Sequence, residues 1–416
     1  MTGRIAARVD EARLWRRHME MARHGATRSG GVNRQALSPE DAAAQNELIG
    51  WGEAIGLTAS SDPAGNLFLR LEGTERGAAP VLTGSHLDSQ PTGGRFDGAY
   101  GVLAGLEAIQ AIVEAGERPR RPIELVAWMN EEGSRFAPGM MGSEVFAGMR
   151  ELDDVLAVRD LDGVSVLDAL AATRAALPRV LEVPLHRPVA AYIEAHIEQG
   201  PVLEREGKTI GVVTGIQGKR TFRVEVTGEE AHAGTTPLAE RKDALLAATR
   251  MVQCLHAMCA QRGGEEVMFT VGRLAVEPNA PSVVPGIATF SIDLRHPDQP
   301  TLERLGDAVA PSCETARGPC RVSVTQLVDA PSLKFPSSMR NRIRRIAADL
   351  RLPSLDLPSL AGHDARQMHR IAPSGMIFIP CRAGISHNEA EWAEPAHLAE
   401  GARVLAELLA EVAAAE

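Results

Sequence analysis

Histidine and carboxylate side chains follow several of the apolar runs in this sequence. His86 closes one such run, Asp97 follows the glycine-rich turn after it, and a later run stops just before Glu131 and Glu132. Imidazole nitrogens and carboxylate oxygens are the ligands that zinc, manganese and cobalt accept in proteins. These residue types at the ends of separate runs therefore predict a metal centre.

Five residues of this kind supply more ligands than one ordinary zinc ion takes. They are His86, Asp97, Glu132, His196 and His387. If Asp97 bridges with its two oxygens, two ions a few ångströms apart can share it. We expect His86 and His196 to complete the coordination of one ion, and Glu132 and His387 to complete that of the other.

Two carboxylates remain outside this ligand set. Asp88 lies two residues from His86 and so on the same side of an extended chain, where it is expected to hold that imidazole by its second nitrogen. Glu131 is adjacent to a ligand and is not needed as one. We therefore predict that Glu131 is the general base, which takes a proton from the attacking water and returns it to a leaving nitrogen.

The elements that must position these residues begin with a strand, a helix and a second strand. The apolar run 81–86 is followed by the helical stretch 99–116 and by another apolar run, 123–129. Two strands joined by a helix are parallel, so the groups that follow them gather outside the same edge of the sheet. Two further strand-like runs, 189–195 and 375–380, precede the other two histidines. The pattern predicts an α/β domain with a mixed, mostly parallel sheet and flanking helices.

The texture of the sequence changes near residue 208. After a first strand at 209–216, the expected order is strand, helix, strand, strand, helix, strand, which is the ferredoxin-like order. We therefore expect an inserted α+β domain at 209–328. The catalytic domain would then comprise a first part at 1–208 and a second part at 329–416.

Composition limits the partners and the compartment. The 416 residues carry a net charge of −10, so no general attraction to nucleic acid or to an anionic membrane is expected. No apolar stretch approaches the roughly 18 residues that span a bilayer, and the amino terminus has no signal-peptide core. Five cysteines without a Cys-x-x-Cys pair fit reduced thiols. These features predict a cytoplasmic protein.

Six motifs, in this order along nearly the whole chain, closely resemble those of the hydantoinase/carbamoylase-type amidases. That family includes N-carbamoyl-L-amino acid hydrolases, allantoate amidohydrolases and β-ureidopropionases. The resemblance implies a metallopeptidase-like catalytic domain, two divalent ions (zinc first, with manganese, cobalt or nickel as alternatives), the ligand set above and Glu131 as the base. Related peptidases usually carry a carboxylate at the position of His196, which favours a ureido or amidine carbon. The motifs lie at 83–89, 94–98, 130–136, 194–201, 232–237 and 384–387.

The same resemblance implies roles for the inserted domain. This domain would form a homodimer and close over the site as a lid, so that His232 reaches the developing oxyanion from the partner subunit. Arg295 would grip the substrate carboxylate as a fork, with Gln199 nearby. Ser282 stands where the family commonly has asparagine, which shortens one expected substrate contact.

Together these features predict an amidohydrolase that cleaves the carbamoyl C–N bond of N-carbamoyl-L-amino acids and releases ammonia and carbon dioxide. The nearest alternatives are an allantoate amidohydrolase and a β-ureidopropionase, which act on other small ureido acids. A more distant alternative is an aminoacylase or dipeptidase, which would release no ammonia. A catalytically inactive relative that only binds a small acid is the alternative of a different class.

Overall fold

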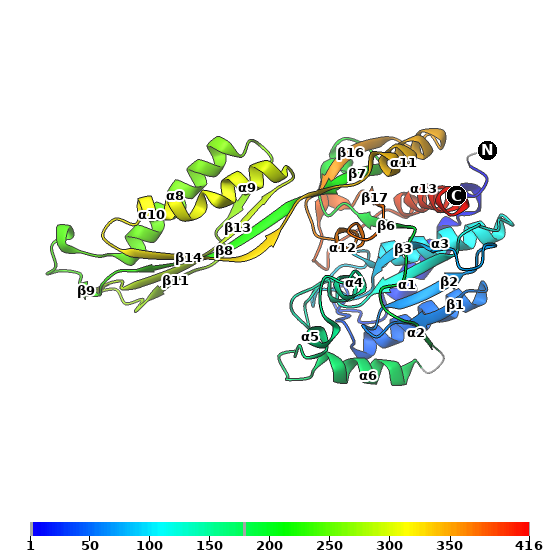
Figure 1. Ribbon diagram of the computed structural model, residues 1–416, viewed down its shortest axis with the longest axis horizontal. Coiled ribbons are helices and arrows are strands. Elements are labelled where there is room, and N and C mark those ends of the chain that lie inside the picture. The colour runs from blue at the N-terminus through cyan, green and yellow to red at the C-terminus, as the bar shows by residue number, and fades with distance from the viewer. Residues whose placement is uncertain (1–2, 178–179, 416) are drawn as a thin grey trace. The chain divides into compact units, whose positions relative to one another are not determined.

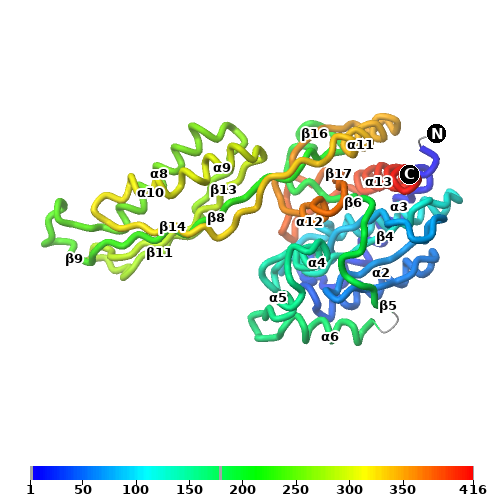
Figure 2. The backbone as a smooth tube through the Cα atoms, in the orientation of Figure 1, coloured from blue at the N-terminus to red at the C-terminus, as the bar shows by residue number. Residues whose placement is uncertain are grey.

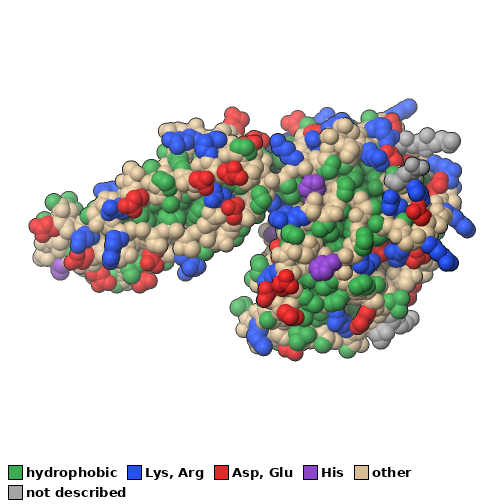
Figure 3. Space-filling view, viewed as in Figure 1, with side chains coloured by type: hydrophobic (Ala, Val, Ile, Leu, Met, Phe, Trp, Pro, Cys, Tyr) green, Lys and Arg blue, Asp and Glu red, His purple; other side chains and the backbone are tan. Residues whose placement is uncertain are grey.

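The computed structural model describes residues 3–177 and 180–415, and the chain divides into two compact units (Figures 1 and 2). The large unit comprises residues 1–214, 335–357 and 361–416, and the small unit comprises residues 215–334 and 358–360. Among the described residues, no helix is both long enough and apolar enough to cross a membrane. On the face shown in Figure 3, acidic and basic side chains are interspersed over both units.

A ten-stranded sheet runs through the large unit in the order β15-β7-β17-β6-β3-β4-β2-β1-β5, with β16 also paired to β7. The central strands β17, β6, β3 and β4 are parallel to one another, and the flanking pairs β17–β7, β4–β2 and β2–β1 are antiparallel. The strands are β1 (Thr58–Ser61), β2 (Leu67–Leu71), β3 (Val81–His86), β4 (Ile123–Trp128), β5 (Leu181–Glu182), β6 (Ala191–Ile197), β7 (Ile210–Ile216), β15 (Leu333–Lys334), β16 (Ser354–Ser359) and β17 (Ser374–Ile379).

The four central strands are buried along their whole length. Parallel strands need cover on both faces, which explains why their sequences are nearly continuous apolar runs. Helices α1 (Glu11–Met21), α3 (Ala99–Glu114), α11 (Ser337–Asp349) and α13 (Pro395–Ala414) pack together and share one hydrophobic core with the sheet. Helices α2 (Pro39–Ala54), α4 (Met141–Phe146), α5 (Leu152–Leu156) and α6 (Val166–Ala176) complete the longer helices of this unit. The predicted fold class is thereby confirmed.

The small unit is an antiparallel sheet with helices on one face. Its strand order is β10-β13-β8-β14, with β11 also paired to β13, so β10 and β11 together take the place of the second strand in the ferredoxin-like order. The elements are β8 (Gly218–Thr227), α8 (Ala244–Arg262), β10 (Met268–Thr270), β11 (Leu274–Glu277), β13 (Ile287–His296), α9 (Gln299–Asp307), α10 (Val309–Ala316) and β14 (Arg321–Ala330). A separate two-stranded ladder joins β9 (Ala231–His232) to β12 (Val283–Val284).

One expected element has a different place. The strand expected at 209–216 as the first of the inserted domain is β7, and it pairs with β17 through Val212 and Gly211. The small unit therefore begins at residue 215 and continues to 334. Local sequence did not indicate this, because an apolar strand does not specify which sheet it joins.

Candidate active site

Three of the expected ligands form a buried group, which we call the buried triad: His86, Asp97 and His196. Asp97 Oδ1 lies 3.2 Å from His196 Nε2 and 3.9 Å from His86 Nε2. All three side chains are buried, and one donor atom of each lies within 4.8 Å of the others. Two imidazoles and a carboxylate at this spacing are a suitable ligand set for a divalent metal ion.

The second group, which we call the open triad, consists of Asp97, Glu132 and His387. His387 Nε2 lies 3.2 Å from Asp97 Oδ2 and 3.4 Å from Glu132 Oε2. The side chain of His387 is 50% exposed, whereas that of Asp97 is 5% exposed. Asp97 thus turns one oxygen toward each triad, which is the geometry expected of a bridging carboxylate.

The parallel strands bring these residues to one edge of the sheet. His86 ends β3 opposite Trp128 near the end of β4, and His196 lies near the end of β6. Asp97 comes from the turn that enters α3, and Gly98 in this turn has a φ of 63°. A Cβ at Gly98 would lie 2.3 Å from Cε1 of His86, so this position needs glycine both for its backbone conformation and for space.

Backbone carbonyls orient the two buried imidazoles. His86 Nδ1 donates to the carbonyl oxygen of Asp88 (2.8 Å), and His196 Nδ1 donates to that of Ile197 (2.9 Å). The Nε2 atoms are thereby left facing the carboxylate, as metal-ligating histidines require. Burial lowers the pKa of His86 to about 4, so its imidazole is neutral at physiological pH.

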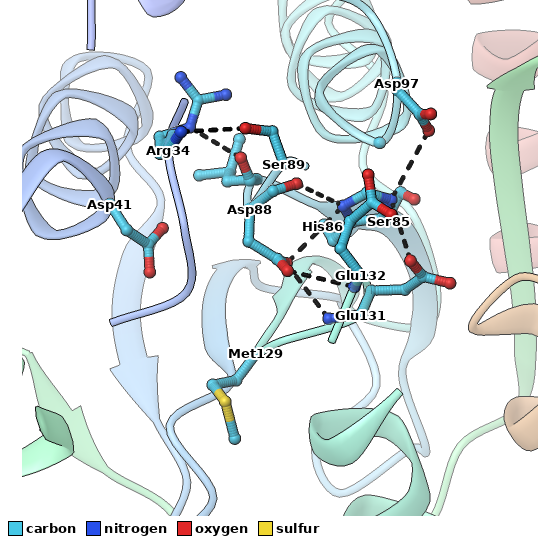
Figure 4. A network of polar contacts seen from close by, with 12 residues as sticks. Arg34, Asp41, Ser85, His86, Asp88, Ser89, Asp97, Met129, Glu131 and Glu132 are labelled. Carbon is cyan, nitrogen blue, oxygen red and sulfur yellow. Dashed lines mark hydrogen bonds and ion pairs between the residues drawn. The ribbon is translucent and has the colours of Figure 1, made fainter. Parts of the chain in front are cut away.

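The side chain of Asp88 has a different role from the expected one. Its Oδ1 lies 3.7 Å from His86 Nδ1, beyond hydrogen-bond distance. The carboxylate instead accepts the backbone N–H groups of Glu131 (3.2 Å) and Glu132 (3.1 Å), as Figure 4 shows. Asp88 therefore holds the turn that carries the proposed base and a ligand, while its own carbonyl holds the imidazole. The spacing of two residues between His86 and Asp88 could not show whether the carboxylate or the backbone carbonyl of Asp88 contacts the imidazole.

Glu131 lies beside the buried triad. Its Oε2 is 3.5 Å from His86 Nε2, and its side chain is 11% exposed. Burial, followed by the charges of Asp364 and Glu132, raises the pKa of Glu131 well above its usual range. A carboxylate with a raised pKa beside a metal centre is suited to accept a proton.

Carboxylates dominate the charge of this site. Burial and then the charge of Asp97 raise the pKa of Glu132 to about 8. Within the described ranges, no lysine or arginine forms an ion pair with Asp97, Glu131 or Glu132. Buried carboxylates that lack such partners are costly unless cations bind them, so the donor set fits divalent metal ions.

Hydrogen bonds fix the shared carboxylate further. Gln199 Nε2 (2.8 Å) and Ser386 Oγ (2.6 Å) both donate to Asp97 Oδ2. Burial favours the neutral form of Asp97, but the hydrogen bonds from the two facing histidines outweigh it and hold its pKa well below the usual range. Gln199, which the family resemblance placed near the substrate carboxylate, thus contacts the carboxylate that the two triads share.

A third donor group, Glu194, His196 and His363, lies behind the buried triad. The rings of His196 and His363 are 4.5 Å apart. Glu194 already accepts hydrogen bonds from Ser85 Oγ (2.7 Å) and the backbone N–H of Ala365 (2.9 Å). This carboxylate therefore supports the strands under the site. In the sequence, this role of Glu194 was indicated only by its position two residues before His196 on the same strand.

Two further predicted site residues lie at the β9–β12 ladder of the small unit: His232 belongs to β9, and Ser282 directly precedes β12. His232 is exposed, and its Nδ1 accepts the N–H groups of Gly234 (3.0 Å) and Thr235 (3.2 Å). Since Nδ1 is an acceptor, the ring proton is on Nε2. The backbone carbonyl of Ser282 accepts the N–H of Ala233.

Arg295 lies near the end of β13 and lines a pocket of about 580 Å³ within the small unit. Its guanidinium makes a two-point contact with Asp293, Nε to Oδ1 at 2.8 Å and Nη2 to Oδ2 at 3.0 Å. One edge of the expected fork is therefore already occupied by Asp293.

Comparison with known proteins defines the class. The chain belongs to the peptidase family M20/M25/M40, whose profile matches residues 82–411. A crystal structure of an amidase of the hydantoinase/carbamoylase family from Burkholderia multivorans matches with a TM-score of 0.91 and 42% identity, over 98% of this chain and 99% of that one.

Two curated relatives specify the branch. The chain is 40% identical to the N-carbamoyl-L-amino-acid amidohydrolase of Rhizobium meliloti, over 98% of this chain and 97% of the relative. It is 35% identical to the allantoate amidohydrolase of Bacillus subtilis, over 94% and 95% respectively. The resemblance expected from the six motifs is confirmed, and the chain is an amidohydrolase of the carbamoylase and allantoate amidohydrolase branch.

Proposed function

We propose that the protein is a cytoplasmic, homodimeric hydrolase that cleaves the carbamoyl C–N bond of N-carbamoyl-L-amino acids. The observation that carries the proposal is the shared carboxylate: Asp97 turns Oδ1 toward His196 and Oδ2 toward His387. Glu131 stands beside this group, 3.5 Å from His86. Similarity over nearly the whole chain to an N-carbamoyl-L-amino-acid amidohydrolase supports the choice of substrate.

The two triads would each hold one divalent ion, zinc or alternatively manganese, cobalt or nickel. The buried triad offers two imidazoles and one carboxylate oxygen, and the open triad offers one imidazole and two carboxylate oxygens. When bound, such ions would polarise the carbamoyl carbonyl and lower the pKa of a water molecule.

Glu131 would move the proton. It accepts a proton from the attacking water as the water oxygen bonds to the carbamoyl carbon. One C–N bond then breaks, and Glu131 returns the proton to the leaving nitrogen. The carbamic acid that remains loses carbon dioxide, so the products are the amino acid, ammonia and carbon dioxide. The raised pKa of Glu131 suits both halves of this exchange.

His232 would stabilise the oxyanion from the partner subunit. Its Nε2 carries the ring proton because two backbone N–H groups donate to Nδ1, so it can donate to developing negative charge. Mixed dimers of His232→Ala and Glu131→Gln protomers should regain activity at one site in two. No recovery in such dimers would count against a site shared between subunits.

Arg295 would bind the substrate carboxylate. Because Asp293 holds one edge of the guanidinium, the remaining N–H groups are presented in a fixed direction. Ser282 would stand at the edge of the substrate site, where its short hydroxyl reaches less far than an asparagine amide.

Some of the alternative functions belong to the same reaction class, and others do not. Similarity to an allantoate amidohydrolase favours allantoate as the second candidate substrate, and β-ureidopropionate is a third. Binding without turnover is less consistent with the donor set, because Glu131 lies beside five potential ligands. Cleavage of acyl or peptide bonds is disfavoured by His196, because related peptidases usually carry a carboxylate at this position.

The test is ammonia release by metal-stripped protein reloaded with zinc, manganese, cobalt or nickel. The substrates are N-carbamoyl-L-amino acids, allantoate, β-ureidopropionate and N-acetyl amino acids. We expect metal-dependent ammonia from N-carbamoyl-L-amino acids above all. Ammonia mainly from allantoate would move the assignment to the second candidate, and amine release from acetylated compounds without ammonia would overturn the proposal.

A further inference from the structure

Glu391 is a buried carboxylate beside the site that belongs to neither triad. It lies four residues after His387 and is 3% exposed. Its Oε1 accepts two backbone N–H groups, those of Phe96 (2.8 Å) and Asp97 (3.1 Å). A hydrogen bond from two amides to one ionisable oxygen is among the stronger restraints that a loop can have.

The same residue closes the turn that follows His387. The backbone N–H of Glu391 donates to the carbonyl of Asn388 (3.0 Å). One residue therefore joins two ligand-bearing segments that lie far apart in the sequence, the turn at Asp97 and the loop at His387. His387 itself has a φ of 53°, which a residue other than glycine adopts only when its surroundings enforce it.

The glycine-rich motif before Asp97 is shaped to receive this side chain. A Cβ at Gly94 would lie 2.0 Å from both Cδ and Oε1 of Glu391. The backbone of Gly94 is outside the left-handed region, so space rather than φ requires glycine here. The glycine at position 94 in this motif is therefore explained by the side chain of Glu391, which occupies the space of a Cβ.

Stability alone does not account for this residue. Its second oxygen, Oε2, is buried and has no hydrogen-bond partner among the residues that the structure describes. An unpaired buried carboxylate oxygen opposes folding, so its retention requires another reason.

We propose that Glu391 is a positioning residue that fixes Asp97 relative to His387 and thereby forms the open triad for its ion. The inference rests on the proposed two-ion function. The buried triad depends on it less, because His86 and His196 are held by β3 and β6 and by their own carbonyl contacts. His387 is held by a loop, and two side chains tie this loop to the segment of the shared carboxylate: Ser386 donates to Asp97 Oδ2, and Glu391 accepts the backbone N–H of Asp97.

The test compares metal binding by five variants with the wild type, by metal content after dialysis and by titration calorimetry of the stripped protein. Glu391→Ala should keep one ion and bind the second about 10–100-fold more weakly, the usual cost of losing a contact behind a ligand. Glu391→Gln keeps an acceptor oxygen and should restore the second affinity to within a few-fold. Glu394→Ala is the matched control, because Glu394 lies in the same segment and pairs with Arg382 at the surface.

Gly94→Ala reaches the same contact without altering Glu391. The added methyl displaces the carboxylate of Glu391, so the affinity for the second ion should fall as it does in Glu391→Ala. Gly50→Ala is its control, because a Cβ there would lie more than 4 Å from every other side chain and loop that the structure describes. Should Glu391→Ala fail to fold, the Gly94 and Gln variants still decide the matter.

Hydrogen exchange of the 93–99 segment separates the two possible failures. Glu391→Ala should speed exchange at Phe96 and Asp97, and Glu391→Gln should not. Wild-type affinity for both ions together with unchanged exchange in Glu391→Ala and Gly94→Ala would overturn the inference and leave the proposed function intact. A wild type that binds fewer than two ions would overturn the proposed function. Hydrogen exchange of the 93–99 segment would then test by itself whether Glu391 holds the turn at Asp97.

Discussion

The two triads share Asp97 but are built from different parts of the fold. His86 and His196 end parallel strands inside the large unit, and backbone carbonyls hold their rings. Glu132 and His387 come from loops, and His387 is half-exposed. Donors fixed by strands bind a metal with little reorganisation, whereas donors on loops must be held by neighbouring side chains. We expect the buried triad to bind its ion more tightly and the open triad to exchange its ion.

The largest effect should come from a residue that is in neither triad. Glu131→Gln should lower kcat for N-carbamoyl-L-amino acids by about 10²–10⁴-fold, the usual contribution of a general base. Both ions should stay bound, because Glu131 is not one of the donors of either triad. Ammonia release and metal content are measured on one preparation, with Glu394→Gln as the control. Loss of metal in proportion to activity would make Glu131 a ligand.

Removing one histidine from each triad tests their difference directly. His196→Ala should weaken the tighter of the two ions by about 100-fold or more, because losing a ligand costs more than losing a contact behind one. His387→Ala should weaken the binding of the second ion only. Calorimetric titration of each stripped variant measures both steps. If the two variants lose the same ion, the triads are one site.

A smaller effect should follow from the support behind the Glu131–Glu132 turn. Asp88→Ala removes the acceptor of two backbone N–H groups and should lower kcat by about 10–100-fold. Asp88→Asn keeps one acceptor oxygen and should lose less. Steady-state ammonia assays compare the two, and equal activity of Asp88→Ala and the wild type would show that the Asp88 side chain does not support the site.

The strand–helix–strand unit and the edge at which the donors meet could be predicted from the sequence. Parallel strands joined by a helix leave little choice of where His86 and Glu132 lie. Contacts made by loops could not be predicted in the same way. Nothing local in the sequence pairs Glu391 with Asp97, since this contact depends on the path of the chain between them.

The partner of β7 illustrates the same limit at the level of strands. Its apolar pattern predicts a strand at 209–216 but does not say whether it joins the sheet before it or the sheet after it. Pairing with β17 places it in the large sheet.

The smallest effect should come from the small unit, outside both triads. Ser282→Asn lengthens the side chain at a position where the family commonly has asparagine. One added hydrogen bond contributes about 0.5–1.5 kcal/mol, so KM for N-carbamoyl-L-amino acids should fall by roughly 2–10-fold with kcat nearly unchanged. The ratio of KM values for N-carbamoyl-L-amino acids and allantoate, measured in both proteins, checks this. A change in metal affinity instead of KM would contradict a role of Ser282 in substrate binding.

Two ions are expected to share Asp97, and turnover is expected to need both. The most direct measurement is stepwise addition of zinc or manganese to the stripped wild-type protein, with bound metal and ammonia release from an N-carbamoyl-L-amino acid followed at each step. We expect two ions per chain, with a tight first binding step that gives little activity and a second step with which activity rises. Full activity at one ion per chain, or activity without metal, would contradict this expectation.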